Sequence, residues 1–455
     1  MAIQPPTATG HPLFGSMLDL QRDALGTYLK AQREHGDVVR FVAGPPGMRA
    51  QFYGVFSPAG AQQVLAQSAA TFRKDSRFYD ELRASFGNGL LTSQDEEHMR
   101  QRRLLNPLFS QRQVDSYCTD IAAEAQELTR RWDEVEDATV DAADEMARYT
   151  LRVIARLLFG TGGDLETALG SVKRNFPIIN AYAVKRAFSP VNIPRKVPTP
   201  GNTKAAKAHQ ELYDVCDQII AARQDAEAEG ESDRHDMLSV LARARDENGE
   251  PLSAQEIREQ VLVFLVTGHE STATSLSFAM HMLALNPDAQ ARAHAEVDAV
   301  LEGRIPGAGD MAQLPYLNQV IKETLRLYPA APSFGRSPDV DVEIGEYVIP
   351  AGSDVLVSPG VIQRRPDIWE DPDLFDPERF LPEREAERGR YTWFPFGGGP
   401  RACVGQHLAM LNAVLTLGAL LQKFEFTAVD TDIPMSTGVT LRAEGPVRVK
   451  LAPRG

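Results

Sequence analysis

The sequence predicts a mainly helical protein with two strand-rich sections. Apolar residues recur with helical spacing over most of the chain up to about residue 330. Two shorter sections, 37–56 and 340–359, are instead bounded by Gly and Pro, as is typical of strands. None of the breaks between segments is long enough to require a flexible linker.

The first strand-rich section predicts a hairpin. Its arms are 37–42 and 50–56, and Gly-Pro-Pro-Gly at 44–47 forms the turn between them. The second section, 340–359, has a Pro-Ala-Gly turn at 350–352. These two sections supply the strands of the predicted fold.

The clearest single element is a helix from Ser253 to Asn286. Ser253 and Glu256 have the spacing of a capping box at its start. The run Val261–Val266 is apolar on every side, which predicts that the helix crosses the interior. Asn286 ends it, and Pro287 occupies the first position of the next helix.

Composition and charge exclude several classes of protein. A chain of 455 residues with 43% hydrophobic residues can bury a large core and still enclose a cofactor. The net charge is -14 and no Lys/Arg-rich block offsets it, which argues against nucleic-acid binding. Residues 1–20 are rich in Pro and Gly without a long apolar run, so we expect an extended segment and neither a signal peptide nor a membrane anchor.

The cysteines predict a reducing compartment. Cys118, Cys216 and Cys403 show no CxxC spacing, and if one of them binds a metal only a single pair remains. A disulfide framework is therefore not expected, and a cytoplasmic location is.

The decapeptide from Phe396 to Gly405 is the most informative stretch of the chain. Three glycines at 397–399 permit tight turns and a close approach to a flat ligand. Arg401 places a cation two residues before Cys403, and a helical run from Gln406 follows, so the sulfur lies near a helix N-terminus that favours a thiolate. The pattern predicts an iron–thiolate socket; the alternative is a structural cysteine beside a glycine-rich turn.

A polar segment, 267–272, interrupts the long apolar helix. Gly268 weakens the helix by about 1 kcal/mol relative to Ala, and hydroxyl groups there can bond back to the preceding turn. Together they predict a notch large enough for dioxygen and a water. A buried Glu270 would need a partner or a proton-transfer role; the alternative is a packing notch with a hydrogen-bonded Glu.

The sequence resembles the cytochrome P450 family. Phe396, Gly399, Arg401, Cys403 and Gly405 match every fixed position of that family's haem-binding signature. The resemblance implies one catalytic domain over 1–455 with the cytochrome P450 fold, containing haem b with Cys403 as axial thiolate, a ligand that favours O–O cleavage. It also implies that Arg401 contacts a haem propionate and that Phe396 packs near the sulfur.

The polar segment of the long helix is similar to the family's oxygen-activation motif. Glu270 takes the place of the acid and Ser271 that of the alcohol, so we expect them to deliver the protons that split O–O. Ser271 stands where Thr is usual, and Thr267 where Ala or Gly is usual. His269 would then face away from the haem. The remaining members of the motif are Gly268 and Thr272, and Thr272 is a second candidate for the alcohol's role.

Two further motifs imply a buried charge network. Glu323 and Arg326 lie one helical turn apart and match the family's ExxR motif, and Arg379 lies in a segment that matches its PERF motif. The resemblance implies that the three side chains support the Cys403 loop. On an arbitrary helix such a pair would be solvated and weak.

Cations are expected around the propionates. His98 and Arg102 match the family's Trp/His-xxx-Arg pattern, and Arg336 follows Arg326 at the spacing of another propionate ligand. For His98 and Arg102 the alternative is an exposed basic helix face. A nearby basic patch of Arg100, Arg103 and Arg112 could steer an acidic redox partner.

The expected substrate is lipophilic. By analogy of position with the family, we expect the pocket to be lined by Phe264, Thr267, Ala331 and Phe334. Further walls are expected from 72–92, 173–196 and 436–440. A terpenoid, steroid, fatty acid or macrolide fits apolar walls. The segment 173–196 is either an amphipathic lid or an ordinary packed helix with a basic outer face.

The resemblance identifies a soluble, bacterial-type haem–thiolate monooxygenase that hydroxylates or epoxidises its substrate with O2. No flavin- or nicotinamide-binding segment is present, so electrons are expected from a ferredoxin and its reductase, with the enzyme a monomer. Two alternatives remain: a peroxide-driven peroxygenase or decarboxylase, in which Arg-Pro usually replaces Glu270-Ser271, and a non-catalytic haem-binding sensor.

Overall fold

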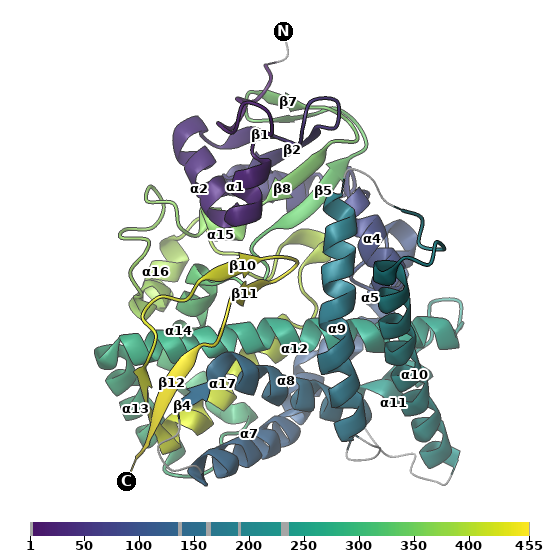
Figure 1. The fold of residues 1–455 in the computed structure, drawn as a ribbon. Helices are drawn as coiled ribbons and strands as arrows, with labels where there is room; N and C mark the ends of the chain where they lie inside the picture. The colour runs from purple at the N-terminus through teal and green to yellow at the C-terminus, as the bar shows by residue number, and fades with distance from the viewer. Residues whose placement is uncertain (1–2, 135–138, 161–164, 190–192, 229–235, 455) are drawn as a thin grey trace. The chain divides into compact units, whose positions relative to one another are not determined.

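The computed structural model describes residues 3–134, 139–160, 165–189, 193–228 and 236–454. Its contacts divide the chain into two compact units. Unit 1 comprises 1–80, 322–403 and 434–444, and unit 2 comprises 81–321, 404–433 and 445–455. Two helices, α4 (Arg77–Phe86) and α14 (Pro315–Leu327), continue along the chain from one unit into the other. Helices predominate and the sheets are small, which confirms the predicted fold class (Figure 1).

Unit 1 is built on a five-stranded sheet in the order β1-β2-β8-β5-β3. The pair β2–β8 is parallel and the other pairs are antiparallel. The strands are β1 (Val38–Ala43), β2 (Ala50–Val55), β3 (Phe72–Arg73), β5 (Phe334–Pro338) and β8 (Asp354–Val357). The hairpin β1–β2 is therefore confirmed, whereas β5 begins before the predicted second section. Two small hairpins are formed by β6 (Val342–Ile344) with β7 (Tyr347–Ile349) and by β10 (Met435–Thr437) with β11 (Leu441–Ala443).

Short helices complete unit 1. They are α1 (Met17–Arg22), α2 (Ala24–His35), α3 (Pro58–Gln62), the π-helix η1 (Gln63–Gln67), α15 (Pro359–Ile362), η4 (Pro377–Phe380), α16 (Pro382–Glu387) and η5 (Gly399–Arg401). The expected extended course of 1–20 is wrong for its last residues, because α1 begins at Met17. The segment before it is held by the sheet, since Thr7 bridges to Arg40 of β1.

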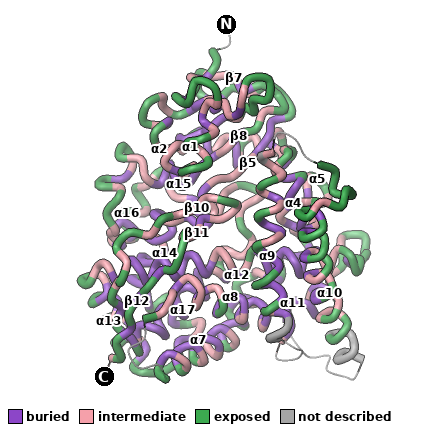
Figure 2. The backbone as a smooth tube through the Cα atoms, viewed as in Figure 1, coloured by how far each residue is buried: buried purple, intermediate pink, exposed green. Residues whose placement is uncertain are grey.

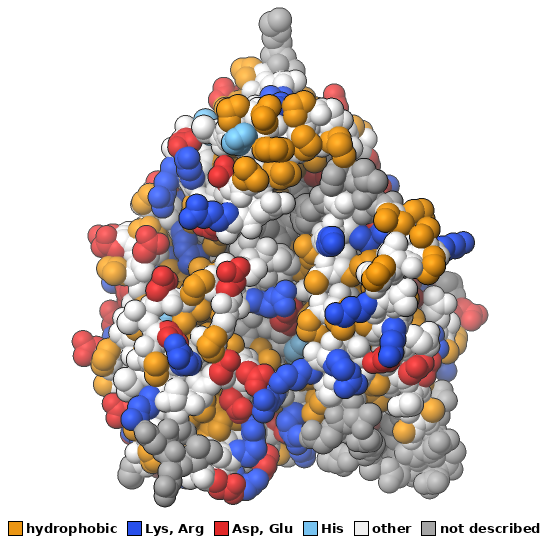
Figure 3. Space-filling model, viewed as in Figure 1, with side chains coloured by type: hydrophobic (Ala, Val, Ile, Leu, Met, Phe, Trp, Pro, Cys, Tyr) orange, Lys and Arg blue, Asp and Glu red, His pale blue; other side chains and the backbone are white. Residues whose placement is uncertain are grey.

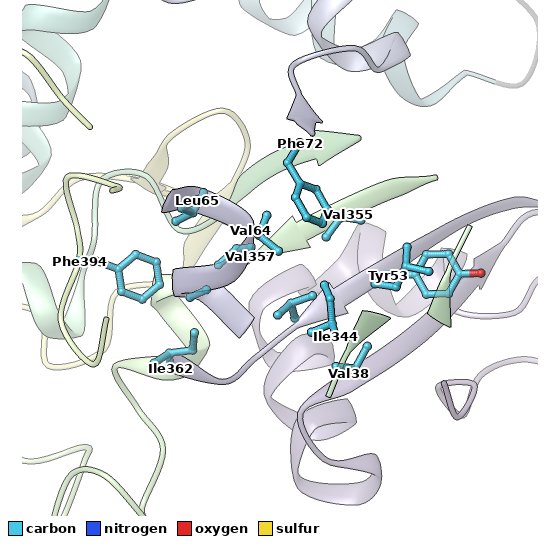
Figure 4. Close-up of a cluster of buried hydrophobic side chains, with 13 residues drawn as sticks. Val38, Tyr53, Val64, Leu65, Phe72, Ile344, Val355, Val357, Ile362 and Phe394 are labelled. Carbon is cyan, nitrogen blue, oxygen red and sulfur yellow. The ribbon is translucent and has the colours of Figure 1, made fainter. Parts of the chain in front are cut away.

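Both faces of this sheet are covered. Successive side chains of a strand point to opposite faces, so Val38 and Val39 of β1 enter different apolar clusters. Val39 packs with Leu25 of α2, whereas Val38 belongs to the cluster that contains Leu65 of η1 and Phe394 (Figure 4). The cluster that contains Val38 therefore extends, through Phe394, to the segment that precedes Cys403.

Apolar side chains also gather on the surface near the N-terminal hairpin and α1 (Figure 3). The exposed large hydrophobic residues of this part of the chain include Leu13, Leu18 and Met48. No helix among the residues placed by the structure combines the length and apolarity that a membrane crossing requires.

Unit 2 is a helical assembly around α12 (Ala254–Leu285). Its other helices are α5 (Asp95–Leu105), η2 (Asn106–Phe109), α6 (Gln111–Ser116), α7 (Cys118–Asp133), α8 (Ala142–Phe159), α9 (Leu165–Phe188), α10 (Pro200–Ala228), α11 (Met237–Arg243), α13 (Pro287–Leu301), η3 (Ala308–Gln313) and α17 (Gln406–Lys423). One antiparallel sheet joins β4 (Thr139–Asp141), β12 (Arg448–Pro453) and β9 (Phe424–Ala428).

The long helix has the predicted boundaries and burial. Ser253 is the N-cap, its side chain and that of Glu256 form the capping box, and Pro287 begins α13. Packing against α8, α10, α17 and β9 buries α12 over most of its length (Figure 2). One contact explains a glycine: a Cβ on Gly268 would lie 3.0 Å from the side chain of Ile154, so Gly268 lets α8 approach closely.

Candidate active site

Cys403 of unit 1 is the accessible cysteine. It is exposed, whereas Cys118 and Cys216 are buried. Burial raises the pKa of Cys118 to about 11 and that of Cys216 to about 12, so both stay protonated thiols. The loop that carries Cys403 is closed by its backbone N–H, which donates to the carbonyl oxygen of Phe396 at 2.8 Å. The sulfur that the sequence singled out is therefore the one available to bind a ligand.

The glycines before Cys403 are required by the loop itself. Gly397 and Gly399 have φ values of 72° and 65°, in the left-handed region that favours glycine. A Cβ on Gly399 would lie 2.0 Å from the carbonyl oxygen of Leu65 in η1. A Cβ on Gly398 would lie 2.5 Å from the ring of Tyr391. The sequence interpretation of these glycines as room for a flat ligand thus covers only part of their role.

Glu323 and Arg326 form a fully buried ion pair in unit 1. Both side chains are 0% exposed, and Arg326 donates from Nε at 2.6 Å and from Nη2 at 2.8 Å to the two carboxylate oxygens. The other N–H groups of Arg326 donate to the carbonyl oxygens of Gln363, Pro372 and Leu374, at 2.9, 2.7 and 3.0 Å. This geometry satisfies the guanidinium completely, as a buried charge requires.

Arg379 is a weaker member of the network than the sequence suggested. Its Nε lies 3.4 Å from Oε1 of Glu323, beyond a good hydrogen bond, and its side chain is 11% exposed. The same oxygen of Glu323 accepts the backbone N–H of Asp376 at 2.9 Å. Arg326 therefore provides most of the compensation for the buried carboxylate.

Gln363 connects this network to the Cys403 loop, and sequence reasoning missed it. Its side chain is fully buried; Nε2 donates to the carbonyl oxygens of Leu325 and Arg326 at 3.0 and 3.1 Å. Its Oε1 accepts the backbone N–H of Phe394 at 3.0 Å. Phe394 lies two residues before Phe396, so one amide transmits the position of α14 to the loop. No motif in the sequence marks it.

Arg336 is a buried cation in unit 1 with no acidic partner among the residues that the structure describes. It is 5% exposed, it lies on β5, and its one hydrogen bond within the described chain goes to the carbonyl oxygen of Gly335 at 2.7 Å. No described carboxylate pairs with it. Because a buried guanidinium needs an anion, this residue fits a haem propionate, and Cys403 in the same unit fits the iron. Arg401 lies in η5, half-buried.

In unit 2, α12 exposes a short polar face. Thr267 is exposed and Glu270 and Ser271 are half-buried, in a helix whose neighbouring residues are buried. The hydroxyl of Thr267 donates to the carbonyl oxygen of Val263 at 2.8 Å, and that of Ser271 to Thr267 at 2.9 Å. The α-helix continues through this face without a break, and the notch itself stays a prediction.

The neighbours of this face point elsewhere. His269 is buried, its Nδ1 contacts the carbonyl oxygen of Leu265, and its ring meets Phe176 edge-on. Burial lowers the pKa of His269, so it stays neutral. It faces away from the polar face, as expected. Thr272 is buried too, which leaves Ser271 as the accessible alcohol of the pair.

The residues expected near the propionates and the redox partner have different surroundings. His98 of α5 is 3% exposed, so an exposed basic face does not describe it, and Arg102 is half-buried. The prediction that Arg100 belongs to a basic patch is wrong, because Arg100 is paired with two acidic residues. Its Nε lies 2.8 Å from Asp246 and its Nη1 lies 2.5 Å from Glu256. Arg100 cross-links α5 to the start of α12.

The four predicted pocket residues have the following surroundings, each within its own unit. In unit 2, Phe264 is buried and packs edge-on against Phe109, with ring centroids 5.6 Å apart. In unit 1, Ala331 is half-buried, and Phe334 lies against Phe394 and beneath Gly397. The lining roles of these four residues remain predictions.

Several basic residues of the segment 173–196 form ion pairs. Lys173 contacts Asp144 at 2.8 Å, and Glu81 accepts from both Arg186 at 2.8 Å and Arg195 at 2.5 Å. These pairs favour the interpretation of α9 as a packed helix with a basic outer face.

Comparison with known proteins agrees with these features. The family model "Cytochrome P450" matches residues 5–451. Cyclooctatin synthase of Streptomyces melanosporofaciens is 36% identical over 98% of this chain and 95% of its own length. Cyclooctat-9-en-7-ol 5-monooxygenase of the same organism is 34% identical, with the same coverage. Pentalenene oxygenase of Streptomyces avermitilis is 32% identical over 97% of this chain and 96% of its own length.

The fold is equally similar to a solved structure. The haem domain of cytochrome P450DA superposes with a TM-score of 0.88 at 26% sequence identity, covering 100% of this chain and 98% of that one. The chain belongs to the cytochrome P450 family, the haem-containing monooxygenases that oxidise lipophilic small molecules with O2 and electrons from a redox partner.

Proposed function

We propose that this protein hydroxylates or epoxidises a terpenoid, using haem b bound through Cys403. The observation that carries the proposal is the exposed sulfur of Cys403 in a glycine loop that a buried ion pair, Glu323–Arg326, supports through Gln363. The terpenoid is proposed from three relatives. Two are named as oxygenases, of cyclooctat-9-en-7-ol and of pentalenene, and the third is named cyclooctatin synthase. The name of the first of these substrates specifies an alcohol.

The residues that would hold the haem are those that the family resemblance implies. In unit 1, Cys403 would bind the iron, Phe396 and Gly405 would flank the sulfur, and Arg336 and Arg401 would pair with propionates. In unit 2, the proposed propionate contacts are His98 and Arg102. When bound, the haem supplies O2 binding and O–O cleavage, which a thiolate ligand favours.

The chain's own contribution to the chemistry is proton delivery. The hydroxyl proton of Ser271 is engaged with the carbonyl oxygen of Thr267, so its lone pairs remain to accept a hydrogen bond from a water. Glu270 is half-buried and can exchange protons with solvent at one end of that water. Thr267 and Gly268 complete the polar face, while Thr272 is turned inward.

The partner and state of the enzyme are also proposals. A ferredoxin with its reductase would supply the electrons, and the enzyme would act as a monomer in the cytoplasm. Because Arg100 is neutralised by Asp246 and Glu256, docking would depend on other cations. The presence of Glu270 and Ser271 disfavours a peroxide-driven reaction.

Two measurements test the proposal. The purified protein should show the red-shifted Soret band of thiolate ligation when reduced under carbon monoxide, and Cys403→Ser should abolish that band while Cys118→Ser retains it. With a surrogate ferredoxin system, a cyclic terpene should be oxidised in proportion to the NADPH consumed. A protein that has the band but oxidises terpenes only with hydrogen peroxide, or not at all, would contradict the proposal.

A further inference from the structure

One buried amide on α12 has an unused donor. Gln260 is 0% exposed, and its Oε1 accepts the backbone N–H of Leu90 at 3.1 Å. That bond fixes the orientation of the amide, because only the oxygen can accept. Its Nε2 is buried and finds no hydrogen-bond acceptor within the described parts of the chain. Buried donors in native proteins are normally satisfied, so a partner from outside the chain is indicated.

The surroundings of Gln260 do not allow the amide to turn away. The segment 87–90 lies directly on α12, since a Cβ on Gly89 would be 2.8 Å from the side chain of Val263. Glu259 anchors the same segment by accepting the backbone N–H of Asn88 at 3.0 Å. The donor is therefore held in one place, which is the property of a recognition group rather than of a mobile side chain.

The position of Gln260 along α12 relates it to the polar face. Thr267 follows it by seven residues and Ser271 by eleven, close to two and three turns of a helix with 3.6 residues per turn. All three residues therefore share one face of α12. At about 1.5 Å per residue, Gln260 is roughly 10 Å along the axis from Thr267.

We propose that Gln260 is a specificity-determining residue whose Nε2 donates a hydrogen bond to an oxygen that the substrate already carries. The inference rests on the proposed function. A terpenoid that lies along this face, with its reacting carbon beside Thr267 and Ser271, presents its far end to Gln260. A hydroxyl or carbonyl group there, roughly 10 Å from the carbon to be oxidised, accepts the hydrogen bond.

This chemistry places the enzyme after another reaction. The substrate oxygen must be installed earlier, either by an oxygenation of the hydrocarbon skeleton or by water capture during its cyclisation. A hydrocarbon of the same skeleton still fits the apolar walls but leaves Nε2 unpaired. The affinity for that hydrocarbon should therefore be lower by the contribution of one hydrogen bond.

The test uses the haem-loaded protein and matched ligand pairs. Each pair is a cyclic terpene hydrocarbon and the same skeleton with a hydroxyl or ketone at the end remote from the oxidised carbon. Spectral titration of the iron gives each Kd. The wild type should bind the oxygenated member about tenfold more tightly, as expected for one hydrogen bond. An isomer with its oxygen at the near end should not gain this affinity.

Substitution then assigns the preference to the residue. Gln260→Met, which keeps the length of the side chain, should remove the preference while leaving the Kd of the hydrocarbon unchanged. Gln255→Leu, an exposed glutamine on the same helix, should retain it. Equal affinities of the wild type for both members, or a preference that survives in Gln260→Met, would overturn the inference. Oxidation of the hydrocarbon by that same wild type would leave the proposed function standing.

Discussion

Removing Arg326 should strand a buried negative charge. In Arg326→Met the carboxylate of Glu323, which is 0% exposed, keeps only the backbone N–H of Asp376 at 2.9 Å and Arg379 at 3.4 Å. Breaking one partner out of a buried pair costs about 3–5 kcal/mol. Since domains are stable by only about 5–15 kcal/mol, the variant loses a large part of its stability.

Arg379→Met is the matched comparison. Arg379 contributes one long contact of 3.4 Å to Glu323 and one hydrogen bond of 3.0 Å to the carbonyl oxygen of Asp371. Its loss should cost about 1.5–3 kcal/mol, the range for a hydrogen bond that involves a charged group. The purified Arg326→Met protein should have a much lower haem content per chain and a weaker carbon monoxide band than Arg379→Met. Its free energy of unfolding in urea should also be much lower.

A double variant separates charge from packing. Glu323→Leu combined with Arg326→Met leaves neither charge buried, so it should be more stable than Arg326→Met alone. If Arg379→Met proves as damaging as Arg326→Met, the assignment of the main partner is wrong. If the double variant is no more stable than Arg326→Met alone, the stranded charge is not the cause of the lost stability.

The other predictions concern the loop, the buried histidines and the proton path. Gly399→Ala should lower haem content, because its Cβ would lie 2.0 Å from the carbonyl oxygen of Leu65 and left-handed backbone alone costs about 1–2 kcal/mol; normal loading would contradict this. Burial lowers the pKa values of His269 and His281, so the unfolded chain takes up protons first as the pH falls below about 6.5. The melting temperature should therefore drop between pH 7.5 and pH 5.5, less steeply in His281→Leu, and an unchanged slope would exclude His281. Ser271→Ala should slow product formation by about 100-fold and divert electrons to peroxide; unchanged coupling would remove Ser271 from the proton path.

Local sequence patterns predicted the elements whose stabilising contacts are short in range. The capping box of Ser253 with Glu256 and the hairpin turn at 44–47 involve neighbours in the chain, so their residues alone specify them. The pairing of Glu323 with Arg326 was predictable for the same reason, because one helical turn separates them.

The failures arose where partners are distant in the sequence. Arg100 is neutralised by Asp246 and Glu256, about 150 residues away, and nothing in a helix pattern shows that pairing. The contact of Arg379 with Glu323 is weaker than that of Arg326 because it is longer, at 3.4 Å, and no motif specifies that distance. Gln363 carries no charge and lies in no periodic pattern, so only the fold reveals that it joins Arg326 to the backbone of Phe394.

Under the proposed function, the amide of Gln363 couples haem binding to the folding of the region around Arg326. The hydrogen bonds of Gln363 join α14 to the segment before Cys403, so a change that disturbs the surroundings of Arg326 should also displace that segment. The red colour of a culture that expresses a variant would thus depend on whether the residues around Arg326 are correctly folded, as well as on the presence of Cys403.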